Sequence, residues 1–153
     1  MKIFLTPLFL LTLASVILSG CNSGRNTITV GLKIELTGIA RAGDGTVQVT
    51  WRVFNPNLAS YLLSQTSHRI YLNGTLVGKT VDADPMGVPA QLSTSKTSKL
   101  LVADPAAERF LREALAADSA SYRVESLITV RLDGENTDRS SLTNSGTVPV
   151  TGK

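Results

Sequence analysis

The chain has 153 residues, a formal net charge of +3 at neutral pH and a single cysteine. One cysteine cannot form an internal disulfide, so the folded state must draw its stability from an apolar core. The charge is too small for the basic footprint of a nucleic-acid-binding domain, and the sequence contains no acidic block of the kind that buffers metal ions.

The first twenty residues have the pattern of an export signal. Lys2 supplies a positive start, residues 3–15 are mostly apolar but short for a membrane span, and small residues precede Cys21. The tetrapeptide Leu18-Ser19-Gly20-Cys21 resembles the lipobox of bacterial lipoproteins, in which the cysteine thiol receives a diacylglyceryl group and the chain is cut before it. The resemblance implies a signal peptide over residues 1–20 and a lipid anchor on Cys21. An ordinary secretory signal and a short anchor helix are the other interpretations.

A short polar tether follows the cysteine. Cleavage leaves 133 residues with a formal charge of +2, because Lys2 is the only charged residue removed. This length suits one domain. Residues 21–27 are predicted to be the lipidated cysteine and its tether, and the six residues after Cys21 span only about 13 Å as a flexible coil. The domain is therefore expected to lie close to the membrane. Asn22 favours the periplasmic face of the outer membrane, since aspartate at that position favours retention in the inner membrane.

Two alternating segments open the domain. Apolar residues occupy every second position from Ile28 to Thr37 and again from Val47 to Val53, a segment that contains Trp51. This period of two predicts two half-buried strands, with Trp51 in the core. The second strand is predicted to end at Asn55-Pro56-Asn57, because proline has no N–H for a ladder and asparagine can bond its own backbone.

A hairpin is predicted around Asn73-Gly74, which lies between two apolar triplets. A type I′ turn needs a positive φ at both central residues, and Asn-Gly accepts this. The expected register places Leu72 opposite Thr75 and Ile70 opposite Val77.

The segments around this hairpin have weaker signals. Residues 57–67 are expected to form a short helical turn or a packed loop. Residues 82–89 contain two prolines and a glycine and are expected to form a loop, and residues 93–102 are expected to form an edge strand.

One helix is predicted late in the chain. Asp104 is a good N-cap, Pro105 suits the first helical position, and apolar residues follow at helical spacing to about Asp118. An alternating strand is expected over residues 122–132. A last short strand around Pro149 is expected at a sheet edge, because proline cannot donate to a ladder.

These elements predict an all-β fold. About seven strands with turn signals between them, and one inserted α-helix, are typical of an immunoglobulin- or fibronectin III-like antiparallel β-sandwich. The predicted domain covers residues 28–150.

Two short motifs in this domain resemble a known family. VTWRVFNPN at residues 49–57 and IYLNGTLVG at residues 70–78 are similar to the core of the late embryogenesis abundant type 2 family, also called the water-stress and hypersensitive-response domain. The resemblance implies a β-sandwich with one helix and a stress-associated, non-catalytic protein without a cofactor. The residues that match the family motif are taken as structural: Trp51, Asn55, Pro56, Asn57, Asn73, Gly74 and Gly78.

The sequence offers few groups for catalysis. His68 is the only histidine and is interpreted as surface or core filler at a strand end, and Cys21 is expected to be acylated. Common zinc sites and nucleophile systems with histidine are therefore not expected. Two acidic clusters remain, Asp82 with Asp84, and Asp133 with Glu135 and Asp138. An ion site is an open alternative for the second cluster, and a hydrolytic carboxylate pair is an open alternative for loops that converge. No catalytic residue, metal or cofactor is predicted.

The leading functional prediction combines the anchor with the resemblance. It is a non-catalytic, envelope-anchored lipoprotein that protects membrane or envelope proteins under desiccation or osmotic stress. Its predicted partners are the membrane, through Cys21, and an envelope protein client, with no nucleic acid. The alternatives are a binding or assembly module for another envelope protein and, less favoured, a hydrolase with a loop-built carboxylate site.

Overall fold

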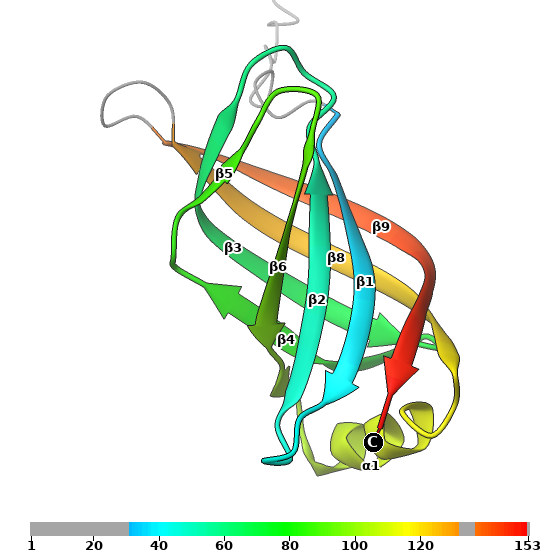
Figure 1. Ribbon diagram of the computed structural model, residues 1–153. Coiled ribbons are helices and arrows are strands. Elements are labelled where there is room, and N and C mark those ends of the chain that lie inside the picture. The colour runs from blue at the N-terminus through cyan, green and yellow to red at the C-terminus, as the bar shows by residue number, and fades with distance from the viewer. Residues whose placement is uncertain (1–30, 132–136, 153) are drawn as a thin grey trace, which may run out of the picture.

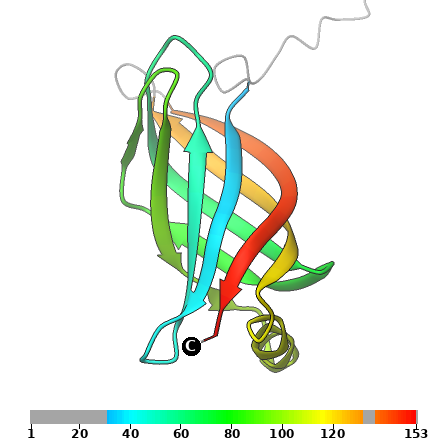
Figure 2. The same cartoon turned by 45° about the vertical axis from the view of Figure 1, so that its right-hand side comes forward.

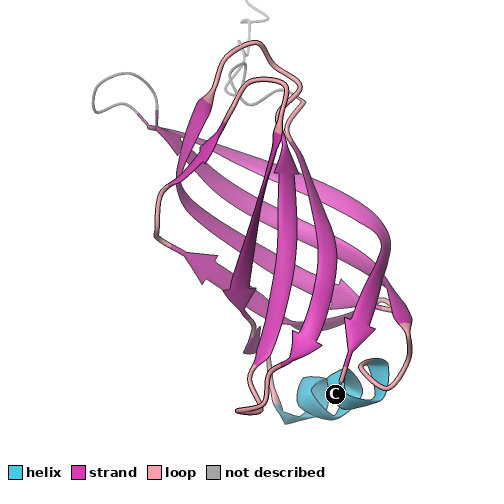
Figure 3. Ribbon diagram, viewed as in Figure 1, coloured by secondary structure: helices cyan, strands magenta, loops and turns pink. Residues whose placement is uncertain are grey.

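The computed structural model describes residues 31–131 and 137–152. The predicted signal peptide at residues 1–20 and the predicted lipidated cysteine and tether at residues 21–27 lie outside the described residues. So do Asp133 and Glu135 of the second acidic cluster. The described part of the chain is mostly strand with one short helix, so the all-β prediction is confirmed (Figure 3).

The described residues form nine strands and one helix (Figure 1). In chain order they are β1 (Lys33–Arg41), β2 (Val47–Phe54), β3 (Tyr61–Leu72), β4 (Thr75–Asp82), β5 (Met86–Val88), β6 (Ser93–Lys99), β7 (Leu101–Val102), α1 (Pro105–Ala114), β8 (Ser119–Arg131) and β9 (Thr137–Thr151).

The strands form one curled, mixed sheet in the order β6-β2-β1-β9-β8-β3-β4-β7, with β5 added beside β3. In Figures 1 and 2, β6, β2 and β1 lie in front of β4, β3, β8 and the first part of β9, and the two groups cross at an angle. The end of β9 turns forward to lie beside β1. The core fills the space between the two groups. The predicted antiparallel arrangement of about seven strands needs correction, because the described residues form nine strands and β1 pairs with β9 in parallel.

The last strand differs most from its prediction. β9 runs for 15 residues inside the strand order rather than at an edge. It pairs with β8 along most of its length and then meets β1, where Val150 lies opposite Ile39. The N–H of Val150 donates to Asp118 O beside β8 (3.2 Å). Adjacent residues of a strand direct their backbone nitrogens to opposite sides, so the nitrogen of Pro149 faces β1 rather than β8. Pairing with β1 begins only at Val150, so the N–H that proline lacks interrupts no ladder bond.

Strand β3 also begins earlier than predicted. Its start at Tyr61 includes most of the segment that was expected to be a turn or loop. A register shift lies between Leu63 and Gln65, and the polar residues Thr66 and His68 take inward positions. Both features hide the apolar alternation that marks a strand in a sequence.

Three further predictions need correction. Leu72 does pair with Thr75, but a register shift places Ile70 opposite Gly78 rather than Val77. The predicted loop over residues 82–89 contains the short strand β5, which pairs with the beginning of β3. The predicted strand over residues 93–102 is divided into β6 and β7, which pair with different neighbours.

Helix α1 follows the predicted capping signals. Asp104 is its N-cap and accepts a hydrogen bond from the N–H of Ala107 (2.7 Å), and Pro105 is the first helical residue. The helix buries its apolar side with Leu111 at the centre and ends at Ala114, earlier than predicted. Within residues 31–131 and 137–152, no helix has the length and apolar character needed to cross a membrane.

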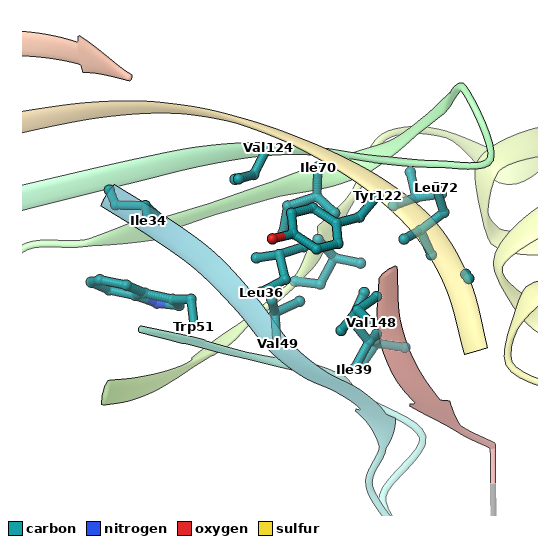
Figure 4. Close-up of a cluster of buried hydrophobic side chains, with 14 of the residues drawn as sticks. Ile34, Leu36, Ile39, Val49, Trp51, Ile70, Leu72, Tyr122, Val124 and Val148 are labelled. Atoms are coloured by element: carbon teal, nitrogen blue, oxygen red, sulfur yellow. The ribbon is translucent and has the colours of Figure 1, made fainter. Parts of the chain in front are cut away.

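The core is built from inward side chains of both groups of strands. Figure 4 shows Ile34 and Leu36 of β1 and Trp51 of β2 on one side, with Ile70 of β3 and Val124 of β8 on the other. All five are almost completely buried. Trp51 lies in the core, as its place in the alternating segment predicts.

Candidate functional site

The Asn55-Pro56-Asn57 motif closes the end of β2 through the side chain of Asn55. This side chain is fully buried. Its amide nitrogen lies within hydrogen-bond distance of the carbonyl oxygens of Ala59 (2.8 Å), Val88 (3.3 Å) and Pro89 (3.2 Å). Its oxygen accepts from the backbone N–H of Asn57 (3.0 Å). One asparagine therefore joins the end of β2, the turn that follows it and the connection from β5 to β6.

Replacing Asn55 with alanine is expected to lower the free energy of unfolding by about 1 to 3 kcal/mol, the cost of leaving buried polar groups without partners. Denaturant unfolding of the domain from Asn22 onward measures this. Asn55→Asp keeps the acceptor but sets a carboxylate against three carbonyl oxygens, so it should destabilise the domain at least as much. An Asn55→Ala midpoint equal to that of the wild type would contradict this role.

The Asn73-Gly74 motif makes the predicted turn and also holds it to β8. Both residues have positive φ, 45° and 84°, and Asn73 Oδ1 accepts from the N–H (3.1 Å) and hydroxyl (2.9 Å) of Ser121. The fold requires a glycine at position 78 for a different reason. A Cβ at this position would collide with the backbone carbonyl of Leu101, where β7 pairs with β4. These motif residues therefore have structural contacts in this fold.

A chain of polar contacts joins Trp51 to the molecular surface. The indole N–H of Trp51 donates to the hydroxyl of Ser98 (2.9 Å), which donates to the carboxylate of Asp82. Lys96 Nζ forms an ion pair with Asp82 Oδ1 (3.3 Å). Asp82 belongs to β4, whereas Ser98 and Lys96 belong to β6, so these contacts bridge the two groups of strands.

His68 is at the centre of β3 and fully buried, not at a strand end. Its ring contacts the indole of Trp51, with centroids 4.4 Å apart, and its Nδ1 lies 2.8 Å from the hydroxyl of Ser126. Its Nε2 has no hydrogen-bond partner among the described residues, and neither do the hydroxyls of Thr66 and Thr80. Burial lowers the pKa of His68 to about 4, and the charge of Asp82 opposes this shift. His68 is therefore neutral at physiological pH and packs as part of the core, which is one of the two roles expected for it from the sequence.

The acidic residues do not form a cation site within the described ranges. Asp82 is held by Lys96 and Ser98, and Asp84 lies beside the same lysine with a 3.9 Å separation. Among residues 31–131 and 137–152, no group of three or more histidine, cysteine or acidic side chains could hold a metal ion. Of the second cluster, only Asp138 is described, and it lies at the start of β9.

The most distinctive surface was not predicted from the sequence. Strands β4, β3, β8 and β9 expose five basic side chains on the side away from the core, which we call the outer basic face. They are Arg69, Lys79, Arg123, Arg131 and Arg139. The small net charge hides this face, although Arg123 and Arg131 occupy outward positions of one alternating segment, which is the signal that could have revealed it.

Comparison with known proteins bears on the fold. No family model matches the chain, and no curated protein matches it. Solved structures do. A protein from Archaeoglobus fulgidus is 14% identical, with a TM-score of 0.46 over 78% of this chain and 95% of that one. At2g46140.1, a candidate late embryogenesis abundant protein, is 13% identical, with a TM-score of 0.44 over 78% of this chain and 71% of that one.

A further match is At1g01470 from Arabidopsis thaliana, which is late embryogenesis abundant-like. Its solution structure aligns with a TM-score of 0.51 at 16% identity, over 79% of each chain. At this identity the likeness concerns the fold alone. The chain therefore has a late embryogenesis abundant type 2-like fold, as the two motifs predicted.

Proposed function

We propose that this protein is a lipid-anchored, non-catalytic component of the bacterial cell envelope that protects the membrane or nearby proteins during desiccation or osmotic stress. The observation that carries the proposal is the late embryogenesis abundant type 2-like fold, found together with the motif that contains Asn55 and Asn73. Further support comes from the contacts of the side chains best suited to catalysis or ion binding. His68 and Asp82 are both used in contacts that hold strands together.

The anchor in this proposal is Cys21. The signal peptide covers residues 1–20, and residues 21–27 tether the domain to the periplasmic face of the outer membrane. Support comes from the lipobox-like Leu18-Ser19-Gly20-Cys21 and from Asn22. Two or three acyl chains hold a protein stably on a bilayer, whereas one chain binds only marginally.

We also infer that the curled sheet corresponds to an immunoglobulin- or fibronectin III-like sandwich. The pairing of β1, β2 and β6 parallels that of strands A, B and E in such domains, and the pairing of β3, β8 and β9 parallels that of strands C, F and G. Strand β4 then takes the position beside strand C.

Deleting the gene is expected to reduce survival after drying, osmotic upshift or freezing more than it reduces growth in ordinary medium. The wild-type gene should restore survival. Cys21→Ala should restore it poorly and should incorporate no labelled fatty acid, because no other thiol can take the diacylglyceryl group.

Variants of three acids from the two acidic clusters serve as controls in the same rescue experiment. Asp84→Ala, Asp133→Ala and Glu135→Ala should restore survival as well as the wild type does. Loss of rescue by one of them, in a protein that is still folded and acylated, would favour a specific ion-binding or hydrolytic site. Equal survival of the deletion strain and the parent would contradict the protective role.

A further inference from the structure

The outer basic face carries positive charges that the described residues do not neutralise. Arg123 pairs with Glu125 and lies over the ring of Tyr71, with its guanidinium carbon 3.8 Å from the ring centre. Arg69, Lys79, Arg131 and Arg139 are exposed and form no ion pair with any described residue.

Two of these charges stand side by side. Arg69 on β3 lies directly opposite Lys79 on β4 in the ladder. Like charges in opposite positions destabilise a sheet, so this pair by itself weakens the pairing of β3 with β4. Glu125 is also opposite Arg69, on β8, but its carboxylate already accepts from Arg123 and from the hydroxyl of Tyr71 (3.2 Å). An external anion would relieve the repulsion between Arg69 and Lys79.

Acidic residues gather at a different end of the molecule. Helix α1 and its two flanks carry four of them, and the helix lies at one end of the curled sheet (Figure 1). They are Asp104, Glu108, Glu113 and Asp118. Basic residues lie there too, because Arg109 and Arg112 are on the helix and Glu108 pairs with Arg41 and Arg112. That end is therefore close to neutral, whereas the outer basic face has five basic side chains and one described acidic side chain, Glu125.

The centre of the outer basic face is hollowed. A hollow of about 500 Å³ lies over β4, β3, β8 and β9, and its lining includes Arg69 and Lys79 as well as Glu125, the partner of Arg123. The hydroxyl residues Ser67, Ser141 and Thr143 line the same hollow. Cationic groups together with hydroxyl donors are the chemistry that binds phosphate oxygens.

Apolar side chains lie in the middle of this cationic surface. Leu127 of β8 and Val81 of β4 are each 47% exposed and occupy the same row across the sheet, on either side of Ser67. Exposed apolar groups surrounded by basic ones are typical of surfaces that enter the headgroup region of a membrane.

We propose that the outer basic face is a docking surface for a bilayer rich in anionic phospholipid. Lipid phosphates would occupy the hollow beside Arg69 and Lys79, and Leu127 and Val81 would enter the headgroup layer. The inference deepens the proposed function by naming the surface that the tethered domain presents to the membrane. Each basic side chain near an anionic bilayer strengthens binding about fivefold, so the four that form no ion pair with a described residue act together.

The test uses the full chain reconstituted on vesicles of phosphatidylcholine alone or mixed equally with phosphatidylglycerol. An amine-modifying reagent and mass spectrometry give the labelling rate of each lysine. Lys79 should react at least about fivefold more slowly on the anionic vesicles, and added salt should remove this protection. Lys33 on β1 and Lys99 on β6, which are exposed on the opposite side, should react equally on both kinds of vesicle.

Two charge-matched double variants complete the test. Arg69→Gln with Arg139→Gln removes two charges from the outer basic face and should weaken the association about 25-fold, which abolishes protection of Lys79. Lys33→Gln with Lys99→Gln removes the same charge from the other side and should leave the protection intact. Equal labelling of Lys79 on both vesicles would overturn the proposal, and so would equal loss of protection in both variants.

Two further arms separate this inference from its alternatives. Inorganic phosphate added to the phosphatidylcholine vesicles should leave Lys79 reactive, and protection by phosphate alone would replace the membrane surface with a soluble anion site. The anchor is tested separately by flotation with phosphatidylcholine vesicles, which Cys21→Ala should reduce. Protection of Lys79 without acylation of Cys21 would support the docking surface and overturn only the anchor.

Discussion

Trp51→Ala is expected to lower the free energy of unfolding by about 3 to 5 kcal/mol, the range for removing a buried aromatic side chain. Trp51 is 0% exposed, so its removal leaves a cavity that the surrounding strands cannot easily close. It also removes the donor to Ser98 and the ring that packs against His68. Denaturant unfolding of the domain from Asn22 onward gives the value directly.

The control for this prediction is Trp51→Phe. Phenylalanine keeps most of the apolar volume but has no N–H for Ser98, so it should cost clearly less than alanine. The difference between the two variants measures the packing part of the tryptophan contribution. A Trp51→Ala domain with wild-type stability would mean that the pairing of β2 and β6 does not depend on this side chain. That result would contradict the prediction.

The stability of the domain is expected to fall by about 3 kcal/mol between pH 6.5 and pH 4 because of His68 alone. Burial lowers the pKa of His68 from 6.5 to about 4 in the folded protein. Below pH 6.5 the unfolded chain binds a proton at this histidine while the folded chain does not. The contribution is therefore fully present above pH 6.5, is lost as the pH falls, and changes no further below about pH 4.

A variant without the imidazole isolates this effect from the titration of the carboxylates. His68→Gln retains a polar partner for Ser126 but does not titrate, so the difference between wild-type and variant stability should depend on pH only between about 4 and 6.5. Nuclear magnetic resonance of the imidazole should find it neutral at pH 5. A protonated His68 at pH 5 in the folded protein, or a difference that is constant with pH, would contradict the prediction.

Local sequence determined the elements whose signals lie close together in the chain. Alternation around Trp51 marked β2, the Asn73-Gly74 pair marked the hairpin, and Asp104 with Pro105 marked the start of α1. Each signal depends on neighbouring residues: side-chain direction along a strand, positive φ in a turn, or a cap on a free N–H. The motif around Asn55 and Asn73 also carried enough information to indicate the late embryogenesis abundant type 2-like fold.

Only the tertiary structure decided what depends on distant pairing. The parallel contact between Ile39 and Val150 brings together the two ends of the described chain, and no local pattern specifies it. The same applies to His68, whose burial follows from the strands that cover it rather than from its own neighbours in sequence. The outer basic face arises in the same way, because the register of β4, β3, β8 and β9 brings basic residues from separate segments onto one surface, where their charges act together.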